Sequence, residues 1–475
     1  RLDELCAKDA LMNSPANSGS VEQTPIPFSD GVRVWARIAA LSFGGPAGQI
    51  AVMHRILVDE KRWIGENRFL HALNYCMLLP GPEAMQLATY IGWLLHGVRG
   101  GLVAGCLFVL PGFLSIMALS VLYASFQEAS FVQAIFFGIK AAVLAIVIEA
   151  LLRIGKRALK TWPMYLIAAA AFVAIFAFDA PFPLIIAAAA LVGFLGGHFD
   201  PARFLVIRAR ETTEDGESEP EAVLHTGGMA KAQPTWRGAV RTALIWGSIW
   251  AAPIIALILL VGPNHVFTEL AVFFSKLAVV TFGGAYAVLA YMAQEAVQTH
   301  GWLAPGEMLD GLGMAETTPG PLIQVVQFVG FMGGYREADM LGPVASGIAA
   351  SVIVTWVTFV PCFLWIFLGA PFIEKLRGVK LLTAALSAVT AAVVGVILNL
   401  AIWFALHVAF ARLDEVRGYG ARLLVPDFAT IDVASVVIAA AALTAMLRFK
   451  IGMLLVLFVS ALIGSLYYLA MMAGT

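Results

Sequence analysis

An internal duplication limits the folds that this chain can adopt. A shift of 239 residues aligns Phe43-Gly44-Gly45 with Phe282-Gly283-Gly284, and Pro80-Gly81-Pro82 with Pro319-Gly320-Pro321, without a gap. Twelve of the 40 positions from 43 to 82 are identical at this shift, whereas chance would give roughly three. The sequence therefore predicts two homologous halves that share one structural plan.

The composition restricts these halves to a membrane. Of the 475 residues, 60% are hydrophobic and 13% are charged, and the mean hydropathy is +0.86. Soluble domains have about 45–50% apolar and about 25% charged residues. The spacing of the apolar runs lacks the ten-residue alternation of a β-barrel. The sequence therefore predicts an all-α polytopic membrane protein.

The apolar runs each approach the length that spans a bilayer, and together they predict ten to thirteen membrane segments. In the first half they lie at about 32–53, 70–95, 101–126, 131–152, 162–178 and 183–199. In the second half they lie at about 242–261, 266–293, 309–333, 341–369, 379–410, 429–447 and 451–473.

Polar stretches set the expected domain boundaries. Residues 1–32 are predicted to be a mobile tail, and residues 201–240 a flexible cytoplasmic linker, because their charged and small residues cannot build a core. The first repeat domain would then span 33–200 and the second 241–475.

Charges beside the breaks predict opposite orientations of the two repeats. Residues 54–68 carry four Lys or Arg residues, whereas the equivalent residues 293–308 carry none. The positive-inside rule then places the two copies on opposite sides of the membrane, as in inverted repeats. Residues 153–160 carry four further Lys or Arg residues. If every apolar run crossed the membrane, these residues would lie outside when residues 54–68 lie inside, against the positive-inside rule. At least one broken segment is therefore expected to be re-entrant.

The duplicated strings should interrupt helices inside the membrane, because proline and paired glycines disfavour a helix interior. Broken helices at corresponding places in two repeats are typical of substrate sites in secondary transporters. Pro82 and Pro321 favour the first turn of a new helix, whose free N–H groups and positive dipole end suit an anion. Gly44-Gly45 and Gly283-Gly284 permit close backbone approach in the same way. Kinks that only let helices pack are the alternative.

Arg37 and Lys276 align at the same shift, each six residues before its Phe-Gly-Gly string. A cation at the bilayer centre costs about 2.5–3.5 kcal/mol on insertion scales, so one in each copy suggests a role. Two such cations would suit a divalent anion. The alternative is that both reach the headgroup region.

Polar side chains near the helix starts complete the candidate site. Gln86 and Gln324 are expected to hydrogen-bond an oxyanion, and Gln327 lies close by in the sequence. Glu83 and Glu316 are candidates for proton coupling, although a carboxylate in a first turn is stabilised in any case. Glu149 and Arg153, four residues apart, are expected to form an intrahelical pair.

Nothing in the sequence predicts a redox or metal centre. The four cysteines form no CxxC pattern, and no two histidines have haem or metal-ligand spacing. We expect no cofactor, no metal and no covalent chemistry, and we expect that the protein is not an enzyme. A membrane redox enzyme remains a remote alternative.

The paired strings, Trp63 between them and Leu110-Pro111-Gly112-Phe113 with its second-half copy resemble the chromate ion transporter family, in its long, two-domain form. The resemblance covers about residues 33–200 and 241–475. The motif positions that it carries over are Phe43, Gly44, Gly45, Pro80, Gly81, Pro82, Phe282, Gly283, Gly284, Pro319, Gly320 and Pro321. One departure is Ala285, which stands where the first half has Pro46.

The resemblance implies a bacterial inner-membrane protein that exports chromate, with sulfate as a chemically similar competitor, and two domains of opposite topology. The expected partners are chromate, sulfate and the lipid bilayer, with no nucleic acid; a homodimer stays open. The main alternative is a carrier for sulfate or another oxyanion.

Overall fold

The computed structural model describes residues 26–205, 235–282, 285–337, 341–372, 380–418 and 421–473. Gly283 and Gly284, residues 1–25 of the predicted tail and residues 206–234 of the predicted linker lie outside the described residues. Within the described ranges the chain is helical apart from one antiparallel hairpin, β1 (Leu413–Gly418) and β2 (Ala421–Pro426). The prediction of an all-α membrane protein is confirmed, and the hairpin falls between two predicted apolar runs.

The first half contains short helices that precede long ones. They are α2 (Phe28–Leu41), α3 (Gly45–His54), the π-helical η1 (Arg55–Glu60), α4 (Glu66–Cys76), α5 (Glu83–Phe126), α6 (Ser130–Ala158), α7 (Trp162–Phe178), α8 (Phe182–Phe199) and α9 (Pro201–Phe204).

The second half begins with one additional helix and then follows the same order. Its elements are α10 (Trp236–Leu260), α11 (Val266–Val280), α12 (Ala285–Gln294), the π-helical η3 (Glu295–Thr299), α13 (Glu307–Thr317), η4 (Leu322–Gln324), α14 (Val325–Arg336), α15 (Pro343–Gly369), η5 (Ala370–Phe372), α17 (Lys380–Ala409), the hairpin, η6 (Phe428–Thr430), α18 (Val433–Leu447) and α19 (Met453–Ala473).

The duplicated sequence folds into duplicated structure. Shifted by 239 residues, α2 and α3 fall on α11 and α12, and α4 falls on α13 within two residues. Even the π-helical segment recurs, as η1 in the first half and η3 in the second. The equivalent residues Trp63 and Trp302 are both buried. The two halves are therefore structural repeats from the first broken helix onward.

The helices on either side of the breaks are half-length elements. The helices α2, α3 and α4 have 14, 10 and 11 residues, and α11, α12 and α13 have 15, 10 and 11. A helix that crosses a bilayer alone needs about 20 residues. The predicted runs at 266–293 and 309–333 are thus each divided in two, as broken or re-entrant helices require.

Long helices follow the second break in each repeat. The sequence suggests separate runs at 70–95 and 101–126. Helix α5 contains most of both, and non-helical backbone at His96 and Gly97 divides it at the predicted boundary. In the second repeat the same stretch is divided into α14 and α15. Pro111 in α5 and Pro361 in α15 lie at equivalent places, 250 residues apart.

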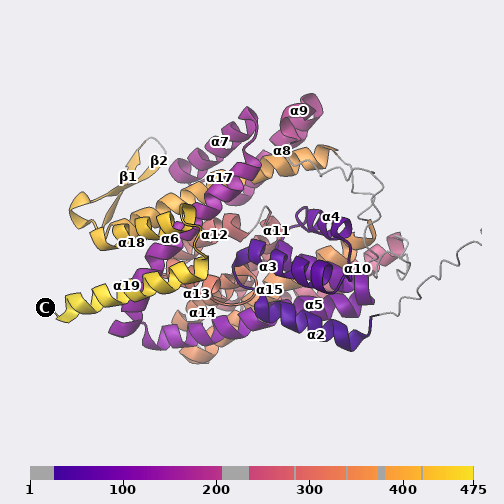
Figure 1. Cartoon of the computed structure of the whole chain (residues 1–475), viewed down its shortest axis with the longest axis horizontal. Helices are drawn as coiled ribbons and strands as arrows, with labels where there is room; N and C mark the ends of the chain where they lie inside the picture. Colours follow the sequence, from indigo (N-terminus) through magenta and orange to yellow (C-terminus); the bar gives the residue numbers. More distant parts are fainter. Residues whose placement is uncertain are drawn as a thin grey trace, which may run out of the picture.

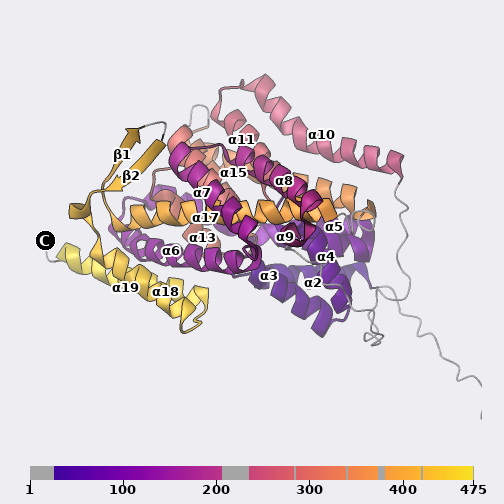
Figure 2. The same cartoon turned by 90° about the horizontal axis from the view of Figure 1, so that it is seen from above.

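Seven helices among the described residues are long and apolar enough to cross a membrane, namely α5, α6, α8, α10, α15 together with η5, α17 and α19. Many large apolar side chains on them are exposed, for example Leu191 at 59% and Leu462 at 52%. A soluble protein rarely exposes apolar surface on this scale, whereas a bilayer solvates it. Figure 2 shows α10 along the outer edge, where none of its residues is buried.

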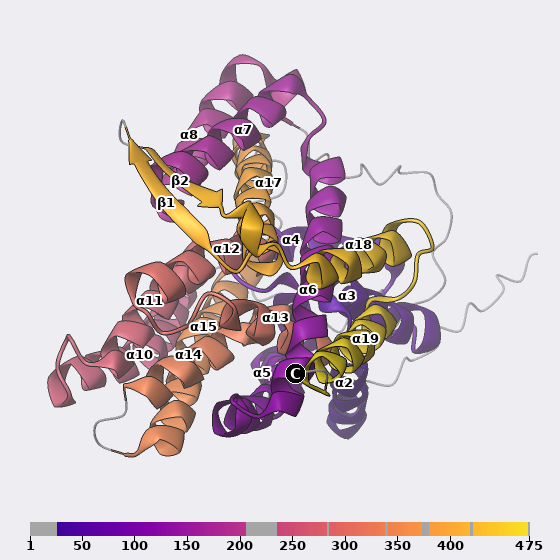
Figure 3. The same cartoon turned by 90° about the vertical axis from the view of Figure 1, so that its left-hand side faces the viewer.

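The last two helices of each repeat pack against a long helix of the other repeat. The first repeat's α7 and α8 pack on α17 of the second repeat, while the second repeat's α18 and α19 pack on α6 of the first. Figures 1 and 3 show α6 and α17 near the middle of the molecule with these pairs outside them. Ala141-Ala142-Val143 in α6 matches Ala391-Ala392-Val393 in α17 at a shift of 250, the same shift that relates Pro111 to Pro361, so the two long helices are equivalents.

Candidate functional site

The Pro-Gly-Pro string of each repeat is hydrogen-bonded to the glycine break of the other repeat. The Gly81 N–H donates to the Thr281 carbonyl at 2.8 Å, and the Gly320 N–H donates to the Ser42 carbonyl at 2.9 Å. Ser42 and Thr281 are themselves equivalent at the shift of 239. We call the region where these segments meet the crossover. It comprises residues 42–45 and 79–82 of the first repeat and residues 281–282 and 318–321 of the second.

The backbone of the crossover requires glycine. Gly81 and Gly320 have φ values of +123° and +105°, and Gly44 and Gly45 have +86° and +67°. Residues other than glycine rarely adopt these backbone angles. Gly81 and Gly320 therefore give the two Pro-Gly-Pro strings the same positive-φ backbone conformation.

Helices begin directly after these strings, as the sequence predicts. Pro82 is the N-cap of α5, and Pro321 is the N-cap of η4, which leads into α14. After the first glycine break, α3 begins at Gly45 with Pro46 in its first turn and no side-chain cap. The first N–H groups of such helices have no partner within the helix and carry the positive end of its dipole.

Each Pro-Gly-Pro string also fits against a long helix of the other repeat. A Cβ added at Gly320 would lie 3.0 Å from the Gly112 Cα in α5, and one added at Gly81 would lie 3.0 Å from the Cys362 Sγ in α15. Gly112 and Cys362 are equivalent positions, each following the helix proline. Pro80 and Pro319, which precede the two glycines, complete the same pair of turns.

Two glutamine side chains, Gln86 and Gln49, donate to the backbone of the crossover, and a third, Gln324, lies directly after it. The Gln86 amide donates to the Pro80 carbonyl at 2.7 Å, and the Gln49 amide donates to the Gly320 carbonyl across the repeats. Gln324 donates to Gln327 at 2.7 Å. Sequence reasoning missed Gln49, although a polar residue four places after Gly45 in an apolar run was a signal.

The side-chain oxygens of Gln49, Gln86 and Gln324 are buried and have no hydrogen-bond partner among the described residues. Whether Gln86 and Gln324 bind an anion stays a prediction. The Gln86 amide group donates to the backbone of the crossover, whereas the Gln324 amide group donates to the Gln327 side chain.

Glu316 is the acidic side chain that is buried at the crossover. It lies in α13, two residues before Thr318, and is 2% exposed. Its Oε1 accepts a hydrogen bond of 2.7 Å from the Tyr286 hydroxyl in α12. Its Oε2 is directed toward the first glycine break, because a Cβ added at Gly45 would lie 3.9 Å from it.

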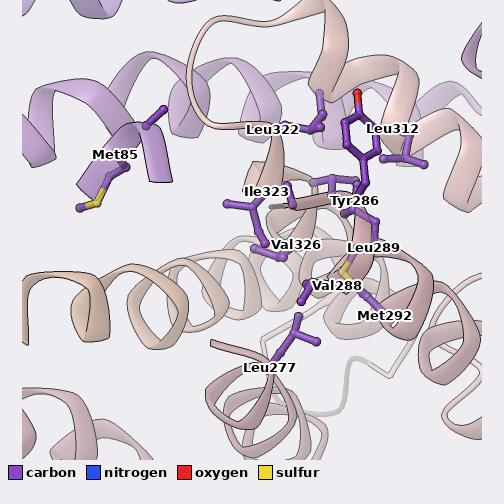
Figure 4. Close-up of a cluster of buried hydrophobic side chains, with 14 of the residues drawn as sticks. Met85, Leu277, Tyr286, Val288, Leu289, Met292, Leu312, Leu322, Ile323 and Val326 are labelled. Carbon is purple, nitrogen blue, oxygen red and sulfur yellow. The ribbon is translucent and has the colours of Figure 1, made fainter. Parts of the chain in front are cut away.

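The packing around Tyr286 comes from several elements. Figure 4 shows its ring beside Leu312 of α13 and Leu322 of η4, with its hydroxyl pointing away from Val288 and Met292. These apolar neighbours exclude water, so the Glu316 carboxyl lies in an apolar layer with one hydrogen-bond donor. Glu83, the other predicted acid, is half-buried in the first turn of α5.

The two predicted cations lie at the surface of the chain. Arg37 donates to Glu60 at 2.8 Å, and its side chain is 50% exposed. Lys276 is also exposed. No hydrogen bond or ion pair within the described ranges joins either cation to the crossover, and their role in substrate binding stays a prediction. Gly283 and Gly284 lie outside the described residues.

The structure also contains a buried charged network that the sequence analysis did not identify. Asp310 is 2% exposed, accepts a hydrogen bond of 2.8 Å from the Tyr123 hydroxyl and lies 3.3 Å from the Lys140 Nζ. One turn away, Arg336 pairs with Glu307 at 2.6 Å. Tyr123 and Lys140 belong to the first repeat and the other three to the second. Lys140 was detectable as a lone cation in the apolar run 131–152.

The expected intrahelical pair of α6 is present, since Glu149 and Arg153 lie 3.0 Å apart. Helix α6 packs against α13, the helix that carries Glu316. Arg153 and Glu149 therefore lie on a helix that packs against the one that carries Glu316. The crossover therefore combines uncapped helix starts, one buried acid and a nearby cation, which suits binding of an anion and a proton rather than covalent chemistry.

Comparison with known proteins identifies one family. Residues 30–194 and 268–465 match the family described as Chromate transporter. A chromate transport protein of Pseudomonas aeruginosa is 33% identical over 397 residues, which cover 82% of this chain and 84% of that protein.

Two further relatives match over similar lengths. A chromate transport protein of Cupriavidus metallidurans is 28% identical, with 81% of this chain and 86% of that protein covered. A probable chromate transport protein of Synechococcus elongatus is 27% identical, with 76% and 80% covered. No solved structure matches the chain significantly.

Proposed function

This chain belongs to the chromate transporter family, and we propose that it is a secondary transporter that exports chromate from the cytoplasm and thereby gives chromate resistance. The relatives over most of its length are named as chromate transport proteins of bacteria. Its long apolar helices suit a multi-pass protein of the bacterial inner membrane.

The reciprocal hydrogen bonds at the crossover are the observation that carries the proposal. They join the broken helices of two repeats, and broken helices at a repeat interface are the usual place for a transported ion. Irregular backbone at membrane depth is stable only where protein surrounds it or where it lines a polar cavity.

The helix starts at the crossover supply the groups that an oxyanion needs. Chromate is a tetrahedral dianion, and the first turns of α3, α5 and η4 offer backbone N–H groups and positive dipole ends. We assign the substrate site to Gly44, Gly45 and the two Pro-Gly-Pro strings. Arg37 and Lys276 would attract the dianion along its path, and the two repeats would rock about this site.

The membrane potential is sufficient to drive such an export. An inside-negative potential favours outward movement by about 2.3 kcal/mol per charge per 100 mV. For a dianion this is roughly 4.6 kcal/mol, or about three powers of ten in concentration. Export therefore needs no energy source besides the potential.

The proposal is tested with everted membrane vesicles in which an inside-positive potential is imposed. We expect chromate uptake by the intact protein and competition by sulfate. Uptake of sulfate with no uptake of chromate would instead indicate a carrier for another oxyanion, and uptake of neither would refute the proposal.

Charge-neutral variants test the two cations in the same assay. Arg37→Gln and Lys276→Gln are each expected to reduce uptake. The matched control is Arg33→Gln, since Arg33 lies on the same helix as Arg37 with its side chain 82% exposed and pairs only with nearby Asp30 in the described chain. Unchanged uptake in both test variants would indicate that Arg37 and Lys276 reach the lipid headgroup region and do not act on the substrate.

A further inference from the structure

Only one of the two oxygens of the Glu316 carboxyl has a hydrogen-bond partner among the described residues. Its Oε1 accepts the Tyr286 hydrogen bond, but its Oε2 is buried and has no partner among the described residues. An ionised carboxylate in an apolar layer needs pairing or hydrogen bonds to offset the loss of hydration. An acid in this position inside a membrane protein therefore suggests a function.

The free oxygen faces the start of a helix. A Cβ added at Gly45, the first residue of α3, would lie 3.9 Å from the Glu316 Oε2. This helix has ten residues, its N-cap Gly44 is left-handed, and no side chain caps it. The Glu316 carboxylate thus lies beside the place where the dipole of α3 would hold an anion.

No cation in the described part of the chain forms an ion pair with Glu316. Of the groups that act on it, Tyr286 comes from α12, and Arg153 and Glu149 come from α6 and already pair with each other. The remaining charged and titratable groups around α13 pair elsewhere: Tyr123 and Lys140 with Asp310, and Arg336 with Glu307. An anion that approaches α3 therefore meets an uncompensated negative charge.

We propose that Glu316 is a proton-binding site that is linked to occupation of the α3 N-terminus by the transported oxyanion, an inference that rests on the proposed function. An ionised Glu316 repels the anion. When a hydronium ion of the solution transfers a proton to the Oε2, one O–H bond of the hydronium ion breaks, a water molecule is released and the carboxyl O–H bond forms. The repulsion then ends, and the new O–H group can donate a hydrogen bond to the oxyanion. No other bond forms or breaks, and the proton and the anion move together.

The other repeat has no equivalent acid. Met77 stands where the second repeat has Glu316, and Ala47 stands where it has Tyr286. The linkage is therefore limited to about one proton for each anion, because like-charge repulsion acts on a single carboxyl. A dianion that moves with one proton carries one net negative charge, so the membrane potential still drives it outward.

The test measures chromate binding and proton uptake together, with the purified full-length chain in detergent. The solution is weakly buffered and mildly alkaline, so that chromate is the dianion, and a pH-indicator dye reports protons. We expect the intact protein to take up about one proton for each chromate bound. We also expect its chromate affinity to fall about tenfold for each unit of rising pH above the range in which Glu316 is protonated.

The variant Glu316→Gln is expected to bind chromate without taking up a proton and with an affinity that does not depend on pH. Asp310→Asn is the matched control, because it removes an equally buried carboxyl of the same helix and should leave proton uptake intact.

Two results would overturn the inference and leave the proposed function standing: chromate binding by the intact protein without proton uptake, or unchanged uptake in Glu316→Gln. The first result needs no variant to fold. Failure of the intact protein to bind chromate would overturn both.

Discussion

Substitution of Gly320 by alanine tests whether the crossover is as tightly fitted as its geometry indicates. Gly320 has a φ of +105°, and its N–H donates to the Ser42 carbonyl at 2.9 Å. A Cβ at this position would lie 3.0 Å from the Gly112 Cα and 3.1 Å from the Gly112 N. Because these neighbours are backbone atoms of a long helix, they cannot rotate out of the way.

The expected loss of stability has two parts. Backbone strain of a non-glycine residue in this conformation costs about 1–3 kcal/mol. Overpacking against the α5 backbone adds about 1–3 kcal/mol. We therefore expect Gly320→Ala to lower the free energy of unfolding by about 2–6 kcal/mol.

Gly301→Ala is the matched control. Gly301 also has a positive φ, +67°, but a Cβ there would meet nothing within 4 Å. Only the conformational part applies, and we expect a loss of about 1–2 kcal/mol.

Both variants are unfolded by SDS titration from detergent micelles, with helical circular dichroism as the signal. The difference between their free energies of unfolding isolates the contact with α5. Equal losses in the two variants would show that Gly320 is not clamped between the repeats, and would refute the fitted crossover.

Three further variants probe the contacts between elements. Asp310→Asn should lower the free energy of unfolding by about 1–3 kcal/mol, and combining it with Lys140→Met should cost less than the sum of the two single losses, because removing one partner of a buried pair strands the other; strict additivity in the SDS titration would contradict this pairing. Gly193→Ala should be destabilising by about 1–3 kcal/mol, since its Cβ would lie 2.6 Å from a carbonyl of α17, whereas Gly247→Ala in α10 meets nothing within 4 Å and should be neutral or stabilising. Arg422→Gln removes the ion pair of 3.4 Å between β2 and the end of α7 and should speed cleavage of the hairpin in limited proteolysis, an expectation that unchanged cleavage would contradict.

The parts of the fold that were predictable are those that depend on backbone chemistry. Glycine and proline act on the residues beside them, so the breaks at Phe43-Gly44-Gly45 and Pro80-Gly81-Pro82 could be located from sequence. Their recurrence 239 residues later predicted the repeat. The hairpin at 413–426 was not predictable in this way, because it is short, polar and stabilised by tertiary contacts such as that of Arg422.

The parts of the site that were not predictable depend on contacts between distant residues. The pairing of Gly81 with Thr281 joins segments 200 residues apart, and no local pattern indicates it. Lys140 and Asp310 lie 170 residues apart in two apolar runs of the sequence, and only the packing of α6 on α13 brings them together. Glu316 was a candidate from sequence, but its free oxygen beside Gly45 became visible only in three dimensions.

The repeats share their backbone but differ in their buried charges, and this difference bears on transport. A fully symmetric pair of inverted repeats would have two equivalent conformations, one open to each side, with equal free energy. Here Glu316 and Asp310 of the second repeat stand opposite Met77 and His71 of the first. If the chain alternates between two conformations as we propose, protonation of Glu316 would stabilise one of them relative to the other. The duplicated glycines would then act as hinges, and the unduplicated Glu316 would set the preference between the two states.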